Sequence, residues 1–520
     1  AELAGGFEFA DVIDAIDAGL AGTFTDAPHL NAMTDEERTA YRTSAPAATG
    51  DGRMPAGARP RGASHPPDPP LLLLCHKNID RTGPRRHAGG IARTPEGATE
   101  RFDAYLARLG EALGHADRIK PLKAYLQGLL VSLPRKSVEP MAACVDPLHV
   151  CRRHQSMHHF VACAPWDDRS VLAVARDYAL EALERHAPIL AWVVDDTGFP
   201  KKGTHSVGVH RQYLGVTGKK DNCQVFVSVS LANRTMSVPC AWRLYLPEPW
   251  AGDDERRALV GVPKDVEFRT KWQIALEELA HLVAEDLPRA PVLADAAYGD
   301  TVEFREGIAA LGLPYAVGVR LETTVWPPGE APLPPKVWKR GTRPTYLRRG
   351  PGHRPVRIEK LARRLPRTAW HTIRWREGTK GRMESRFARL RVRPAHNDHR
   401  RREMRAEVWL LIEWPRGEPG PTRAWFLNVA EDADLRAMVD LVKLRWRIER
   451  DYEDLKRETG LDHYEGRGWR GVHHHGVLSI AAYAFLAAER ARLSPPEPLA
   501  FLRAPAVPAG FRPRGSAREG

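Results

Sequence analysis

Apolar positions along the chain follow a helical period first and a strand period afterwards. Between residues 101 and 190 they recur at intervals of three and four, as in RFDAYLARLGEALG, which predicts amphipathic helices. From residue 192 the apolar runs become short and rich in Val, Phe and Tyr, as in AWVVDD and CQVFVSVSLA, which is typical of strands. The pattern predicts a helical segment followed by a different kind of fold.

Helices and strands then alternate as far as residue 320. The segments KWQIALEELAHLVAED and TVEFREGIAAL predict helices, and APVLADAAYG and PYAVGVR predict strands. Such alternation after a run of strands predicts an α/β fold with a mixed sheet and right-handed crossovers. Residues 325–430 are Pro-rich and then strand-like and basic, as in RFARLRVR, which predicts an all-β insertion, and one long helix should follow it.

The composition indicates which kinds of partner this protein is expected to bind. Lys and Arg number 78 against 65 Asp and Glu, which gives a formal charge of +13 and favours a polyanion, nucleic acid before an anionic membrane surface. No apolar run is long enough to cross a membrane, and the acidic N-terminal stretch resembles no secretory signal. The six scattered cysteines form no CxxC pair, so we expect a cytoplasmic protein.

Two predicted strands end in aspartate. Asp195 and Asp196 follow WVV, and Asp295 follows PVLA. Functional groups gather at the carboxyl ends of strands in open α/β sheets, so these acids should face one crevice. Adjacent strand residues point to opposite faces, and we therefore assign Asp195 to the crevice and keep Asp196 as the alternative first acid.

A third acid is expected from the long helix near residue 450. At about 100° per residue, Leu444, Ile448 and Leu455 form one apolar stripe that should face the core. Glu449 falls beside that stripe, whereas Glu453 and Asp454 are predicted to point away from it. Glu449 is our third carboxylate.

Three converging carboxylates repel one another unless divalent cations neutralise them. Oxygen ligands suit Mg²⁺ or Mn²⁺, and two such ions per active site would serve phosphodiester hydrolysis. The catalytic and metal-binding residues predicted in this way are Asp195, Asp295 and Glu449. The cations predicted to position phosphates are Lys201, Lys202, Arg445 and Lys456.

Several motifs along residues 101–490 carry a family resemblance. They include DDTGFPKKG, LADAAYGD, RWRIERDYEDLK and HYEGRGWRGVHHH, in this order. Here the chain resembles bacterial insertion-sequence transposases of the DDE superfamily, specifically insertion-sequence family seven-hundred-and-one of the insertion-sequence-four-like group. The late-helix pattern of that group is Tyr, Arg, Glu and Lys. Arg445, Glu449 and Lys456 match it, and Val442 stands at the Tyr position.

The resemblance implies a ribonuclease-H-like core and a DNA transposase. Such an enzyme binds the terminal inverted repeats of its element, cleaves double-stranded DNA at the ends, and joins the 3′-hydroxyl to target DNA. Work on both ends requires at least two active sites, so we expect a homodimer in the DNA complex. The expected segments are a disordered or non-family extension (1–100), a helical candidate DNA-end-binding domain (101–190), the first part of the catalytic core (191–324), the β-rich insertion (325–430), the last part of the core (431–490) and a flexible tail (491–520).

Other features leave alternatives open. Arg467 and Trp469 lie in a Gly-rich stretch and are candidates for clamping or stacking on a DNA base, against the alternative of an ordinary loop. Three consecutive histidines, residues 473–475, do not have the spacing of a zinc site and are expected to cap or flank the last helix. Two rival functions remain, a nuclease of this fold without strand transfer and a catalytically silent DNA-binding regulator.

Overall fold

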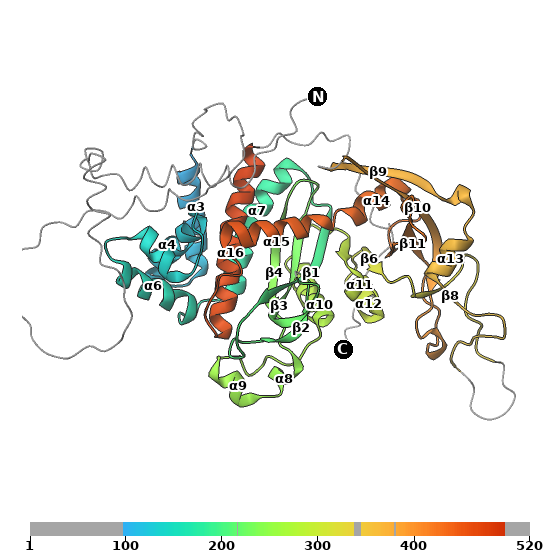
Figure 1. The fold of residues 1–520 in the computed structure, drawn as a ribbon, viewed down its shortest axis with the longest axis horizontal. Helices are drawn as coiled ribbons and strands as arrows, with labels where there is room; N and C mark the ends of the chain where they lie inside the picture. Colours follow the sequence, from blue (N-terminus) through green and yellow to red (C-terminus); the bar gives the residue numbers. More distant parts are fainter. Residues whose placement is uncertain (1–96, 216, 337–344, 379–380, 494–520) are drawn as a thin grey trace, which may run out of the picture.

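The computed structural model describes residues 97–215, 217–336, 345–378 and 381–493. Helices lie at one end of the molecule, a large sheet crosses its centre, and a β-rich part lies at the other end (Figure 1). Nearly all of the N-terminal extension and of the C-terminal tail, predicted to be disordered and flexible, lies outside the described residues.

The segment predicted to be helical is helical. Its elements are α3 (Ala98–Ala112), η2 (Ala116–Arg118), α4 (Ile119–Leu130), α5 (Val138–Val145), α6 (Val150–Ala162) and α7 (Asp168–His186). They pack around the last helix, α16 (Trp469–Leu493). The Tyr105 hydroxyl of α3 donates to the Ala481 carbonyl of α16 over 2.9 Å. The two ends of the described chain therefore share one hydrophobic core.

The centre of the molecule is a mixed sheet. Its strands are β1 (Ala191–Pro200), β2 (His210–Leu214), β3 (Lys219–Ala232), β4 (Ser237–Leu244), β5 (Val292–Ala294), β6 (Tyr315–Val319), β7 (Thr324–Trp326), β8 (Val356–Arg357), β9 (His371–Gly378), β10 (Gly381–Pro394), β11 (Val408–Glu413) and β12 (Arg423–Leu427). The order is β2-β3-β1-β5-β6-β12-β11-β10-β7-β8, with β4 beside β3 and β9 beside β10. The pairs β1–β5 and β5–β6 are parallel, and the other named pairs are antiparallel.

The segment 325–430 differs from the all-β insertion predicted. It contains helix α13 (Ile358–Arg364) and two short 3-10 segments, η3 (Arg367–Ala369) and η4 (Asp398–Arg400). Its strand β12 pairs with β6 from Ala424↔Val319 to Leu427↔Ala316, so the core sheet continues into it. The apolar strands β11 and β12 are buried by extending the sheet, because a strand buries its backbone polar groups only when both edges are paired.

The connections after β4 are helical. They comprise α8 (Glu248–Ala251), α9 (Asp254–Leu259), α10 (Lys271–Ala284), α11 (Ala296–Gly299) and α12 (Val302–Ala310). Helix α10 begins with a capping box in which Thr270 and Gln273 bond each other's backbone. None of the helices in the described ranges has the length and apolar character needed to cross a membrane.

The late helix, predicted as one element, is two. Helix α14 (Leu435–Lys443) ends before Leu444, and α15 (Trp446–Thr459) begins after Arg445. The predicted stripe is confirmed, since Leu444, Ile448 and Leu455 are buried. Asp454, however, is buried rather than pointing to solvent, because α16 covers a second side of α15.

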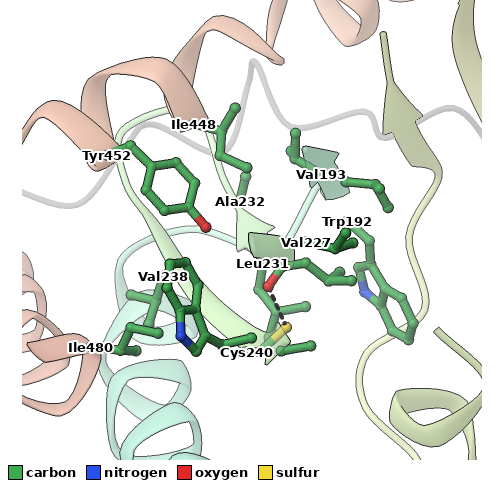
Figure 2. Close-up of a cluster of buried hydrophobic side chains, with 14 of the residues drawn as sticks. Trp192, Val193, Val227, Leu231, Ala232, Val238, Cys240, Ile448, Tyr452 and Ile480 are labelled. Atoms are coloured by element: carbon green, nitrogen blue, oxygen red, sulfur yellow. Dashed lines mark hydrogen bonds between the residues drawn. The ribbon is translucent and has the colours of Figure 1, made fainter. Parts of the chain in front are cut away.

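Helix α15 is fixed to the sheet by its apolar face. Ile448 and Tyr452 point into a cluster that includes Val193 of β1 and Val238 of β4, and Ile480 of α16 closes one side (Figure 2). A fully buried side chain of this kind contributes about 1.5–3 kcal/mol to stability. The burial therefore sets where the polar flank of α15 lies relative to Asp195.

A close approach of two glycines fixes the turn after Asp295. A Cβ added to Gly299 of α11 would lie 2.0 Å from the Gly318 carbonyl oxygen of β6. We predict that Gly299→Ala lowers the free energy of unfolding by about 2–3 kcal/mol, because the backbone atoms it meets cannot move aside. Chemical denaturation measures this, and Gly215→Ala, which meets nothing within 4 Å, is the control. Equal stability of the two variants would contradict the packing described.

Candidate active site

Asp195 and Asp295 lie at the same level of the sheet, but only Asp295 ends its strand, because it directly follows β5. Asp195 lies in the middle of β1, which continues to Pro200, so the prediction that both acids end their strands is wrong for Asp195. Parallel strands β1 and β5 pair Trp192 with Val292 and Val193 with Leu293, and the same offset aligns Asp195 with Asp295. Neighbouring strands are about 4.8 Å apart. Asp295 also caps α11, because its Oδ1 accepts from the backbone N–H groups of Ala297 and Tyr298 over 2.9 and 3.3 Å. The sheet register therefore brings the two carboxylates near each other, and each affects the charge environment of the site.

Asp195 has an unusual charge environment. Its side chain is 18% exposed, and burial raises its pKa to about 7 against the opposing effect of Arg445. The neighbouring carboxylates Asp196 and Asp295 raise the pKa further. A nearby cation stabilises the charged form of a carboxyl group in such a place, and Arg445 is that cation here.

Asp196 lies on the opposite face of β1. It forms an ion pair with Lys271, the first residue of α10, whereas Asp195 is paired with Arg445, which immediately precedes α15. Alternate strand residues face opposite sides, so α10 and α15 cover the two faces at this point. The aspartates are thus divided between two faces, and Asp195 is the one that shares a partner with Glu449.

Arg445 joins the first and third predicted acids. Its Nη1 donates to Oδ2 of Asp195 over 3.0 Å, and its Nη2 donates to Oε1 of Glu449 over 2.6 Å. Burial alone would lower the pKa of Arg445, but Asp195, Glu449 and Asp295 together raise it. One guanidinium therefore holds two of the acids and interacts with the third.

The donor chemistry fits a hard divalent cation, but this arrangement of the side chains does not. Asp195, Asp295 and Glu449 offer only carboxylate oxygens, which suit Mg²⁺ or Mn²⁺. Across the described ranges, no group of three or more Asp, Glu, His or Cys side chains converges closely enough to hold a metal ion. Glu449 keeps a 63% exposed side chain, and the cation between the acids is Arg445.

The other predicted phosphate-binding cations differ in exposure. Lys201 is partly buried and its Nζ donates to the Tyr464 carbonyl over 2.7 Å. Lys456 lies with its Nζ 5.2 Å from the centre of the Phe199 ring. Burial lowers the pKa of both lysines. Lys202 is exposed in the turn that follows β1.

The structure around the start of α16 differs in part from what the sequence predicted. Arg467 is exposed, and its carbonyl accepts from the Val207 N–H over 3.0 Å. Trp469 is half-buried, with its ring 4.3 Å from that of His473. The three histidines, predicted to cap or flank the helix, lie inside α16, where burial lowers the pKa of each to about 4.

The buried histidines serve packing. The imidazole of His473 lies 2.9 Å from the Trp469 carbonyl, and that of His474 lies 3.0 Å from the Val161 carbonyl. His475 bonds the Tyr125 hydroxyl and the Gly460 carbonyl, each over 2.9 Å. These contacts tie α16 to α6, α4 and the end of α15, which explains three polar residues in one buried turn.

Three residues near the acids were missed by sequence reasoning. Lys271 neutralises Asp196, and nothing in a helix-starting lysine distinguishes it from a solvated one. The Tyr298 hydroxyl is buried close to the acids and has no hydrogen-bond partner among the described residues. Asp451 is 1% exposed on the side of α15 turned toward α16, where it accepts from the Tyr483 hydroxyl over 2.9 Å. The helical wheel alone does not predict that Asp451 is buried, because its burial depends on α16.

Comparison with known proteins identifies the family of this chain. The family described as DDE superfamily endonuclease matches residues 108–382. The chain belongs to the DDE superfamily of endonucleases. It is similar to the probable transposase for insertion sequence element IS701 of Microchaete diplosiphon, with 31% identity over 196 residues. That match covers 37% of this chain and 47% of the relative, so the chain spans about half of the relative's length. The predicted resemblance to insertion-sequence DDE transposases is confirmed.

One solved structure is also similar to this chain. It is the piggyBac transposase synaptic complex with hairpin DNA, at 10% sequence identity and a TM-score of 0.35. The similarity covers 79% of this chain and 69% of that one.

The buried acid behind the site gives a pH-dependent prediction. Burial raises the pKa of Asp451 to about 7, from an ordinary value of 3.8. The folded state therefore binds a proton that the unfolded chain has released, so stability falls as pH rises from about 4 to about 7. Asp451→Asn removes this loss, and the stability of the variant relative to the wild type should rise by roughly 2 kcal/mol between pH 5 and pH 8.

Urea unfolding at the two pH values in EDTA measures the difference. Glu453→Gln is the control on the same helix, because Glu453 is exposed and pairs only with Arg457 among the described residues. A difference between Asp451→Asn and the wild type that does not change with pH would show that Asp451 is ionised in the folded protein.

Proposed function

We propose that this protein is a DNA transposase of an insertion sequence. It binds the terminal inverted repeats of its element, cleaves double-stranded DNA at the element ends, and joins the resulting 3′-hydroxyl to target DNA. The observation that carries the proposal is the equal level of Asp195 and Asp295 on adjacent parallel strands, with Glu449 tied to Asp195 through Arg445. Family membership supports the endonuclease chemistry.

The proposed catalytic core is ribonuclease-H-like. It comprises residues 191–324 and 431–490, with the β-rich segment 325–430 between them. The mixed sheet, the acids in β1 and after β5, and the helix that carries Glu449 support this division. In this proposal Asp195, Asp295 and Glu449 hold two Mg²⁺ or Mn²⁺ ions. When bound, such ions activate a water or a 3′-hydroxyl and stabilise the departing oxygen of a phosphodiester.

The cations around the acids are proposed to position the phosphates. Lys201 and Lys456 have pKa values lowered by burial, so each gains from a phosphate that stabilises its charged form. Lys202 and Arg467 are exposed and would contact the DNA backbone. The half-buried indole of Trp469 offers a ring for stacking. The formal charge of +13 supports a polyanionic partner.

End recognition is assigned in this proposal to the helical region, residues 101–190. Acting on both ends of an element requires two active sites, and we therefore propose a homodimer in the DNA complex. The helical region shares its core with α16, so its position relative to the acids is fixed by packing. DNA held there would lie in a constant relation to the cleavage site.

Loss of one acid tests the chemistry. We predict that Asp295→Asn lowers DNA cleavage by roughly 10²- to 10³-fold, the usual cost of losing one group that stabilises transition-state charge, and leaves DNA binding intact. The substrate is a labelled duplex that carries the inverted repeats flanking the gene. Binding is followed by gel shift and cleavage by denaturing gel. Glu303→Gln, an exposed acid on α12, is the matched control.

The rival functions give different products. Wild-type cleavage that persists in Asp295→Asn would remove the central claim. A silent DNA-binding regulator would bind the duplex with no cleavage at all, although two half-buried acids near each other would then remain without a use.

Strand transfer is a separate expectation. In the presence of Mg²⁺ and a supercoiled plasmid, the wild type should join the labelled end to the plasmid, because the 3′-hydroxyl is the attacking group in the proposed second step. Joined product is counted by sequencing the junctions, and reactions in EDTA are the control. Efficient end cleavage without junctions would identify a nuclease that performs no joining.

A further inference from the structure

Arg445 occupies the space among the three acids of the candidate active site. Its two terminal nitrogens donate to Asp195 and Glu449 over 3.0 and 2.6 Å. Asp295 adds to the potential that raises its pKa. The side chain of Arg445 is only 27% exposed, so the interaction is partly shielded from solvent.

The backbone holds Arg445 in this place. Arg445 lies at the break between α14 and α15, where the Leu444 carbonyl accepts from the Arg447 N–H over 3.0 Å. The residue before it, Leu444, is buried, and so is Ile448 one turn later. The guanidinium therefore emerges between two anchored positions and is directed at Asp195.

We propose that Arg445 is a built-in counter-ion that a divalent cation must displace from Asp195 and Glu449. The inference rests on the proposed function, because it assumes that these acids bind the metal. In the metal-free protein Arg445 relieves the repulsion among the acids, and it moves away when the metal binds. The released guanidinium is then available to a DNA phosphate.

Charge balance supports displacement. The three carboxylates carry three negative charges, and Arg445 offsets one of them. Two divalent cations bring four positive charges, so Arg445 would be repelled if it stayed between the acids.

The experiment measures Mn²⁺ binding to the full chain without DNA, by electron paramagnetic resonance of the free ion. We expect Arg445→Gln to bind Mn²⁺ about three- to tenfold more tightly than the wild type, since the competing cation is gone. Arg445→Lys keeps the charge and should stay within about twofold of the wild type. Arg457→Gln is the control, because Arg457 lies on the same helix and pairs with exposed Glu453.

A second measurement uses the wild type alone, so that it does not depend on the folding of a variant. Phenylglyoxal modifies accessible arginine, and mass spectrometry follows the peptide that contains Arg445. Mn²⁺ should increase the rate of modification of Arg445 several-fold and leave that of Arg457 unchanged. A rate that is unchanged or lower with Mn²⁺ would mean that Arg445 stays with the acids, and the inference would be wrong.

The failure of the inference differs from the failure of the proposed function. Glu449→Gln and Asp295→Asn should both weaken Mn²⁺ binding. If they do and Arg445→Gln binds no more tightly than the wild type, only the counter-ion role is rejected. If neither acid affects Mn²⁺ binding, both the metal site and the counter-ion role are rejected.

Discussion

Repulsion between carboxylates that are held close together constrains the whole centre of this molecule. Asp195 and Asp295 are brought to one level by the pairing of β1 with β5, and burial raises the pKa of Asp195 to about 7. Such an arrangement is costly without positive charge nearby. Lys271 on one face and Arg445 on the other supply it, and the positions of α10 and α15 follow from that need as well as from apolar packing.

The packing of α15 connects the core to the chemistry. Its apolar face is buried against β1 and β4, its far side is covered by α16, and only the flank with Glu449 remains exposed. The helix is thus fixed on two sides and has little freedom to rotate. A helix held in this way keeps Glu449 in a constant position relative to Asp195 and Asp295, as the proposed metal site requires.

Much of this could be predicted from the sequence. Strands β1, β3, β5 and β6 have apolar patterns that local sequence determines, and the stripe through Ile448 is buried as predicted, with exposed Glu449 on the flank beside it. The break at Leu444 and Arg445 was missed, because both residues favour helix and only tertiary packing separates α14 from α15. The burial of Asp454 and the pairing of β12 with β6 were missed for the same reason, since each depends on an element distant in sequence. The roles of the acids and of Arg445 remain predictions.

The pairing of β12 with β6 has a practical meaning for protein engineering. Four residue pairs join these strands. The segment from 325 to 430 is therefore part of the central sheet and is not a separate domain that can be removed. Excising that segment would leave β6 with an uncovered edge of unpaired backbone groups, which is a template for aggregation. A shortened version of this protein would need a replacement strand at that edge before it could remain monodisperse.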